Sequence, residues 1–65
     1  MREYLGPNPD EYELQFNNGI HGYVEIEISK DIEDLKTKAL KLSEENPNFE
    51  YRILDYFSFV RFRVG

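Results

Sequence analysis

Residues 11–28 have the sequence EYELQFNNGIHGYVEIEI, which contains two alternating runs separated by a turn signal. Apolar and polar side chains alternate over residues 12–16 and again over 20–28, which is typical of two half-buried strands. Between the two runs, Asn17-Asn18-Gly19 predicts a turn. The stretch is therefore predicted to form a β-hairpin.

The register of this hairpin depends on the length of its loop. A two-residue loop at Asn18-Gly19 would pair Phe16 with His21 and mix the two faces. A three-residue loop over 17–19 pairs Phe16 with Ile20, brings the apolar faces together and places the glycine in the left-handed conformation that such loops need. We therefore expect the three-residue loop.

The residues before the hairpin, 1–10, are predicted to form an N-terminal arm. Gly6-Pro7-Asn8-Pro9 disfavours regular structure, because proline lacks an N–H donor and restricts the residue before it. Residues 11–65 are expected to form the single domain that a 65-residue chain allows. Tyr4 and Leu5 of the arm are candidates to pack against that domain.

Residues 31–46 are predicted to form a helix. Its expected N-cap is Asp31, and Pro47 predicts an end near Glu45 or Asn46. The side chains that share one apolar stripe along this helix are Ile32, Leu35, Ala39 and Leu42, with Leu40 at the margin.

Residues 49–64 are too long for one strand of a compact domain, since they would span about 53 Å when extended. A turn at Asp55-Tyr56 gives strands 49–54 and 57–64, and a four-residue loop from Leu54 to Phe57 fits the same register. In that register, apolar side chains face each other and Arg52 lies opposite the ring of Phe59.

The predicted fold class is α+β, a single ββαββ domain with one helix on one face of a four-stranded antiparallel sheet. We suggest the strand order 1-2-4-3, which makes the strand–helix–strand crossover right-handed and keeps neighbouring strands antiparallel. One helix can cover only one face of the sheet. The other face is therefore expected to be uncovered.

The candidate binding site is this uncovered face. Its expected centre is a patch of exposed rings, Tyr23, Phe57 and Phe59, because soluble monomers seldom expose contiguous apolar groups without a use for them. The remaining candidate residues are Leu54 beside the rings, Arg52 and Arg61 around them, and Glu11, Glu13, Glu25 and Glu27 at one end of the face. An alternative is that the rings cover the sheet, stacked on arginine side chains or capped by the arm.

The segment Phe57-Ser58-Phe59-Val60-Arg61-Phe62 resembles the second half of the RNP1 signature of RNA-recognition motifs. The resemblance implies base stacking on Phe57 and Phe59, with Tyr23 near the other stacking position. Asp55 and Tyr56 replace the basic residue and glycine that open that signature, and the second helix of that fold is absent. The resemblance covers six residues of the chain.

Composition excludes several kinds of site. The chain has no cysteine for disulfides, zinc or thiolate chemistry, and its single histidine, His21, has no neighbours at metal-ligand spacing. The serines have no recognisable base partner, so we expect no enzyme, metal or cofactor. No apolar run approaches the roughly 18 residues of a membrane span, and no signal-peptide core is present, so we expect a cytoplasmic protein.

The net charge of −5 favours basic partners over nucleic acid. The first interpretation is a non-catalytic module that binds a protein with a basic surface, as a small acidic inhibitor or accessory protein or a mimic of nucleic acid. The second is a single-stranded nucleic-acid binder that uses the same rings. A third is a homodimer formed through the uncovered face or an edge strand.

Overall fold

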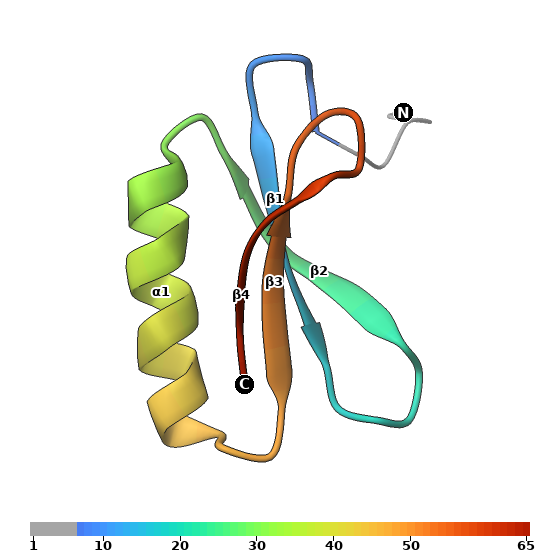
Figure 1. Cartoon of the computed structure of the whole chain (residues 1–65), viewed down its shortest axis with the longest axis vertical. Helices are drawn as coiled ribbons and strands as arrows, with labels where there is room; N and C mark the ends of the chain where they lie inside the picture. The colour runs from blue at the N-terminus through green and yellow to red at the C-terminus, as the bar shows by residue number, and fades with distance from the viewer. Residues whose placement is uncertain (1–6) are drawn as a thin grey trace.

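The computed structural model describes residues 7–65 as one four-stranded antiparallel sheet with a helix packed on one face (Figure 1). The elements in chain order are β1 (Tyr12–Asn17), β2 (Tyr23–Ser29), α1 (Ile32–Glu45), β3 (Glu50–Leu54) and β4 (Val60–Val64). The predicted α+β class and ββαββ arrangement are confirmed. The predicted packing of Tyr4 and Leu5 concerns residues that lie outside the described part.

Helix α1 begins and ends where the sequence predicts. The side chain of Asp31 accepts hydrogen bonds from the backbone N–H groups of Glu33, at 3.0 Å, and Asp34, at 3.2 Å. It therefore satisfies two of the donors that a helix start leaves unpaired. At the other end, the N–H of Asn46 donates to the carbonyl of Leu42 at 2.8 Å, and Pro47 prevents a further turn.

The predicted strand order is wrong, because the observed order is β2-β1-β3-β4. The central strands are β1 and β3, where β2 and β4 were expected. The right-handed crossover decides on which side of β2 strand β3 lies, and it leaves room for one strand between β2 and β3. Either β1 or β4 can occupy that position, and in the structure it is β1. Both edge strands carry two like charges, Glu25 and Glu27 on β2 and Arg61 and Arg63 on β4, which opposes the pairing of either edge with its own copy.

The β1–β2 loop spans residues 18–22 rather than the predicted 17–19, and Phe16 pairs with Val24 instead of Ile20. The cause is the asparagine pair. The side-chain oxygen of Asn17 accepts from the N–H of Gly19 at 2.7 Å, and that of Asn18 accepts from Ile20 at 2.9 Å, so two local turns follow each other. Gly19 has the expected positive φ of 84°.

A bulge in β2 changes which side chains face the helix. The register with β1 shifts between Leu14 and Gln15, so that Gln15 lies opposite Glu25 but Leu14 lies opposite Glu27. Ile26 is the extra residue. Glu27, which was expected on the uncovered face, therefore lies on the helix side, where it accepts a hydrogen bond from Lys38 of α1.

The C-terminal hairpin has a five-residue loop, residues 55–59, in place of the predicted shorter turn. Phe62 pairs with Ile53, and Leu54 pairs with Val60 across a second bulge at Arg61. Arg52 lies opposite Arg63, not opposite Phe59 as predicted. The longer loop again has a local cause, the hydrogen bonds of Asp55 that are described below.

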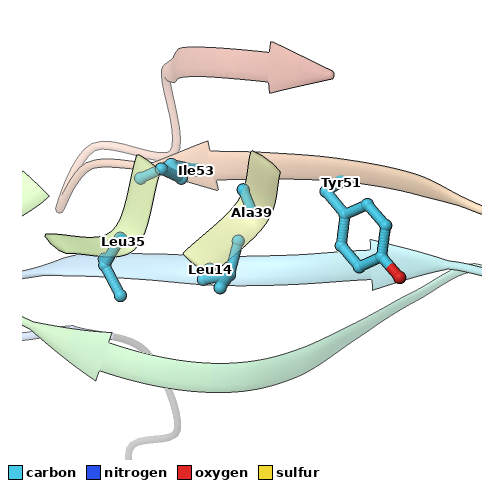
Figure 2. Packing of buried hydrophobic residues seen from close by; sticks show 5 residues of the cluster. All are labelled: Leu14, Leu35, Ala39, Tyr51 and Ile53. Carbon is cyan, nitrogen blue, oxygen red and sulfur yellow. The ribbon is translucent and has the colours of Figure 1, made fainter. Parts of the chain in front are cut away.

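The core lies between α1 and the two central strands. Figure 2 shows side chains from the helix and from both strands meeting in one cluster, which consists of Leu14, Leu35, Ala39, Tyr51 and Ile53. Burial of each large side chain in this cluster stabilises the fold by about 1.5–3 kcal/mol. The edge strands contribute only partly buried residues to this core. Within residues 7–65, no further strand pairs with their outer edges.

Candidate functional site

The most exposed aromatic side chains lie in the aromatic loop, which we define as residues 55–59 between β3 and β4. Phe57 is 72% exposed and Phe59 is 65% exposed. Tyr56 is also exposed, and its ring meets that of Phe57 edge-on with the centroids 5.2 Å apart. The loop therefore presents three aromatic rings at the surface of the domain, and two of them are in contact.

Asp55 holds this loop in shape. Its side-chain oxygen Oδ1 accepts from the backbone N–H of Phe57, at 2.9 Å, and of Phe59, at 3.0 Å. Its backbone closes the loop from both sides, since its N–H donates to the carbonyl of Phe59 and its carbonyl accepts from Ser58, each at 3.0 Å. Oδ2 accepts from Arg61 at 3.3 Å. The rings are thus exposed on a hydrogen-bonded loop rather than a loose one.

The aromatic loop lies at an acidic end of the domain. β1 begins there, β2 and β3 end there and α1 begins there, so the turns at the top of Figure 1 lie at the same end. We define this end as residues 10–13, 30–36 and 55–61. These residues carry seven acidic and three basic side chains, a net charge of −4: Asp10, Glu11, Glu13, Asp31, Glu33, Asp34 and Asp55 against Lys30, Lys36 and Arg61. The end of the domain that carries the exposed rings is therefore negatively charged.

The sheet face away from the helix carries a polar network instead of the expected ring patch. Tyr23 reaches across β1 and donates its hydroxyl to Glu50 of β3, and the guanidinium of Arg52 lies 3.4 Å from the centroid of its ring. The hydrogen bond to the Glu50 carboxylate raises the pKa of Tyr23 above its ordinary value of 10.0, with help from desolvation. Tyr23 therefore acts in this structure as a cover for the sheet.

The same network continues toward the acidic end. Arg52 donates through Nε to the side-chain oxygen of Gln15 at 2.8 Å, and Gln15 donates through its amide nitrogen to Glu13 at 2.8 Å. Glu13 is only 8% exposed, so this amide bond partly replaces the water that its carboxylate loses on folding. On the other side, Arg63 lies 3.6 Å from Glu50.

The structure divides the predicted site residues into separate groups. Tyr23 lies on the edge strand β2, and the aromatic loop joins β4 at the opposite edge, three strand spacings or roughly 14 Å across the sheet. Leu54, expected among the exposed rings, is buried, with Val60 and Glu13 as its neighbours in register. The predicted patch of Tyr23, Phe57 and Phe59 does not form.

The other predicted residues have individual environments. Arg61 binds Asp55, and Glu11 closes the turn before β1 by accepting from the N–H of Asn8 at 2.9 Å. Glu25 is exposed on β2 opposite Gln15. Glu27 binds Lys38 on the helix side, and the hydrogen bonds that Lys38 donates to Glu27 and Asp34 raise the pKa of Lys38 above its ordinary value. Of the predicted set, only Phe57 and Phe59 remain together as exposed rings.

The arrangement implied by the RNP1 resemblance is not present. Phe57 and Phe59 precede β4 and lie in the loop, so they do not stand side by side on the face of a central strand. Tyr23, the other implied stacking position, is engaged by Glu50 and Arg52 at the far edge. The negative charge of the acidic end also opposes the binding of phosphates.

Sequence reasoning missed an apolar groove between α1 and the sheet. Its volume is about 200 Å³, and its lining residues are Phe16, Ile26, Leu42, Phe49 and Tyr51. Only Leu35 and Ala39 of α1 are fully buried, so the short helix leaves Ile26 and Val24 of β2 partly exposed. The sequence did contain a signal for this groove, because the apolar stripe of the predicted helix is too narrow to cover one face of a four-stranded sheet.

Residues 7–65 contain no cluster of three or more histidine, aspartate or glutamate side chains arranged to hold a metal ion. In the same part of the chain, no helix is both long and apolar enough to cross a membrane.

Comparisons with known proteins give no relative for this chain: no family model matches it, and no curated protein or solved structure shows significant similarity to it.

Proposed function

We propose that this domain is a non-catalytic protein-binding module whose contact surface is the aromatic loop at its acidic end. The observation that supports this proposal is the exposure of Phe57 and Phe59 on a loop whose backbone is held by Asp55. Large aromatic side chains contribute most to binding free energy at protein interfaces. A loop that is already ordered loses little conformational entropy on binding.

The charge around the loop indicates the chemistry of the partner. A net charge of −4 at this end attracts a basic surface and raises its association rate, while it repels nucleic acid and acidic proteins. The partner is therefore a protein with an apolar cleft for the rings and basic residues around that cleft. A small acidic inhibitor or accessory protein fits this description, and so does a mimic of nucleic acid that occupies a nucleic-acid-binding protein.

The experiment compares three forms of the chain as bait for proteins from the source cells, with quantitative mass spectrometry of what each form retains. The forms are the wild type, the variant Phe57→Ala/Phe59→Ala and the control Ile20→Ala. Ile20 is a matched control because it is 74% exposed and lies in the β1–β2 loop at the opposite end of the sheet. We expect basic proteins to be retained by the wild type and the control, and lost from the double variant.

Equal retention by all three forms would contradict the proposal. A parallel titration with fluorescent single-stranded oligonucleotides at low salt tests the second interpretation. Micromolar or tighter binding that falls steeply with salt and is lost in Phe57→Ala/Phe59→Ala would assign the rings to nucleic acid instead.

A further inference from the structure

The two edge strands of the sheet each pair with only one neighbour within residues 7–65: β2 with β1, and β4 with β3. Unpaired backbone N–H and C=O groups along a strand edge can accept a further strand. Each step across the sheet reverses direction, so β2 and β4 run antiparallel to each other. A second copy placed beside the first in the same orientation would therefore present its β2 antiparallel to β4 of the first.

One register of this pairing matches both faces of the sheet. It places Val24 opposite Val64, Glu25 opposite Arg63 and Ile26 opposite Phe62. Within the chain, Val24, Val64 and Phe62 lie opposite the core-side residues Phe16, Tyr51 and Ile53, so they belong to the helix side. Glu25 and Arg63 lie opposite Gln15 and Arg52, which belong to the other face. Apolar side chains would thus meet on one face, and opposite charges on the other.

Pairing of identical edges is disfavoured by the same charges. Two β2 strands paired antiparallel about Glu25 or Ile26 bring glutamates opposite each other, and two β4 strands paired about Phe62 bring Arg61 opposite Arg63. Glu27 and Arg61 already bind Lys38 and Asp55 within the chain. Arg63 lies 3.6 Å from Glu50 but is 55% exposed, so its guanidinium can also face Glu25 of a neighbouring copy. Glu25 and Arg63 are therefore the charges that favour unlike edges over like ones.

The exposed apolar residues of β2 favour a partner at that edge. Val24 is 41% exposed and Ile26 is 40% exposed, although both lie toward the helix side of the sheet. A strand added beside β2, with Phe62 and Val64 on its helix side, would cover both residues and extend the apolar surface at the groove. A five-residue strand contact is small compared with the roughly 800 Å² per partner of a stable interface, so the association is weak.

We propose that copies of this chain associate head to tail, with β2 of one copy added to β4 of the next to form a continuous antiparallel sheet. The contact is heterologous, so each copy keeps one free edge and the assembly can grow. It involves a different surface from the aromatic loop, and it does not depend on the proposed function.

Charge reversal at the two edges tests this proposal by sedimentation velocity over a wide range of protein concentration at low salt. The wild type is expected to show a mass that rises with concentration. The single variants Glu25→Arg and Arg63→Glu should associate about tenfold more weakly or worse, because like charges then face each other. The double variant Glu25→Arg/Arg63→Glu, and an equimolar mixture of the two single variants, should regain association.

Circular dichroism shows whether each variant is folded before its mass is interpreted. The variant Phe57→Ala/Phe59→Ala should associate like the wild type, since the aromatic loop is outside the contact. A wild type that stays monomeric at every concentration would overturn the proposal. Single variants that associate like the wild type, a folded double variant that fails to regain association, or loss of association in Phe57→Ala/Phe59→Ala would overturn it as well.

Discussion

Replacement of Asp55 by alanine should destabilise the whole domain while leaving its core side chains unchanged. The substitution removes the acceptor for two backbone N–H groups, those of Phe57 and Phe59, and the ion partner of Arg61. Loss of a side-chain acceptor that caps backbone donors in this way costs about 0.5–2 kcal/mol. The ion pair with Arg61, which is about half exposed, adds at most about 1 kcal/mol.

These contributions give an expected loss of about 1–2 kcal/mol for Asp55→Ala, because water can reach the freed amides in an exposed loop. For a domain of this size, that corresponds to a fall in Tm of roughly 5–15 °C. Asp55→Asn is the matched control, since its side-chain oxygen can still accept from the two amides. It should lose only the ion pair and cost about 0.5 kcal/mol.

Urea unfolding followed by circular dichroism measures both variants. The expected order of stability is wild type, then Asp55→Asn, then Asp55→Ala. Equal stability of Asp55→Ala and the wild type would refute the idea that this side chain orders the loop. Equal losses in the alanine and asparagine variants would show that the negative charge matters, not the hydrogen bonds to the backbone.

Three further changes have definite expected outcomes. Leu35→Ala should cost about 2–5 kcal/mol, which is most of the stability of a small domain, so its thermal melt should be shifted far down or lost; an ordinary melt would contradict the assigned core. Gly22→Ala should cost about 1 kcal/mol in urea unfolding through its positive φ of 77° alone, because nothing lies near the added methyl group; no change would contradict that backbone geometry. Glu50 raises the pKa of Tyr23 in the folded state, so the folded state holds the proton of the Tyr23 hydroxyl more tightly than the unfolded chain does. The stabilisation from the Tyr23–Glu50 bond is therefore complete below about pH 10 and is lost as the pH rises further. Tyr23→Phe should therefore lose less stability than the wild type in urea unfolding above about pH 10, and an identical alkaline profile would exclude the Tyr23–Glu50 bond.

The parts of the fold that local sequence determines were predictable. Asp31 and Pro47 set the limits of α1, the alternation of apolar residues revealed the four strands of residues 7–65, and the helical repeat of apolar residues revealed α1. These signals act within a few residues of each other, so one sequence is enough to interpret them.

The registers and the strand order were not predictable from the same signals. The side chains of Asn17, Asn18 and Asp55 bind nearby backbone N–H groups and lengthen both hairpin loops to five residues. Each longer loop shifts the strand pairing by several residues, and the bulge at Ile26 turns Glu27 to the helix side. Short asparagine and aspartate side chains allow several turn types, and the choice among them depends on tertiary packing.

The candidate site shows the same limit. Phe57 and Phe59 were predicted to be exposed rings, and both are exposed. The predicted patch with Tyr23 depended on the strand order and the register, and neither prediction was right. Asp55, the residue that shapes the loop, was predicted only as part of a turn. Its role depends on the position of its carboxylate relative to the N–H groups of Phe57 and Phe59. Composition and periodicity do not predict that position.

The proposed function requires that Phe57 and Phe59 lie outside the core, where a partner can reach them. Urea unfolding of Phe57→Ala/Phe59→Ala measures whether they do, with Leu35→Ala as the reference for a true core residue. Side chains that are 72% and 65% exposed should cost within about 0.5 kcal/mol each, so the double variant should unfold close to the wild type. A loss of about 3 kcal/mol or more per ring, as for a buried phenylalanine, would place these rings in the core and contradict the proposed binding site.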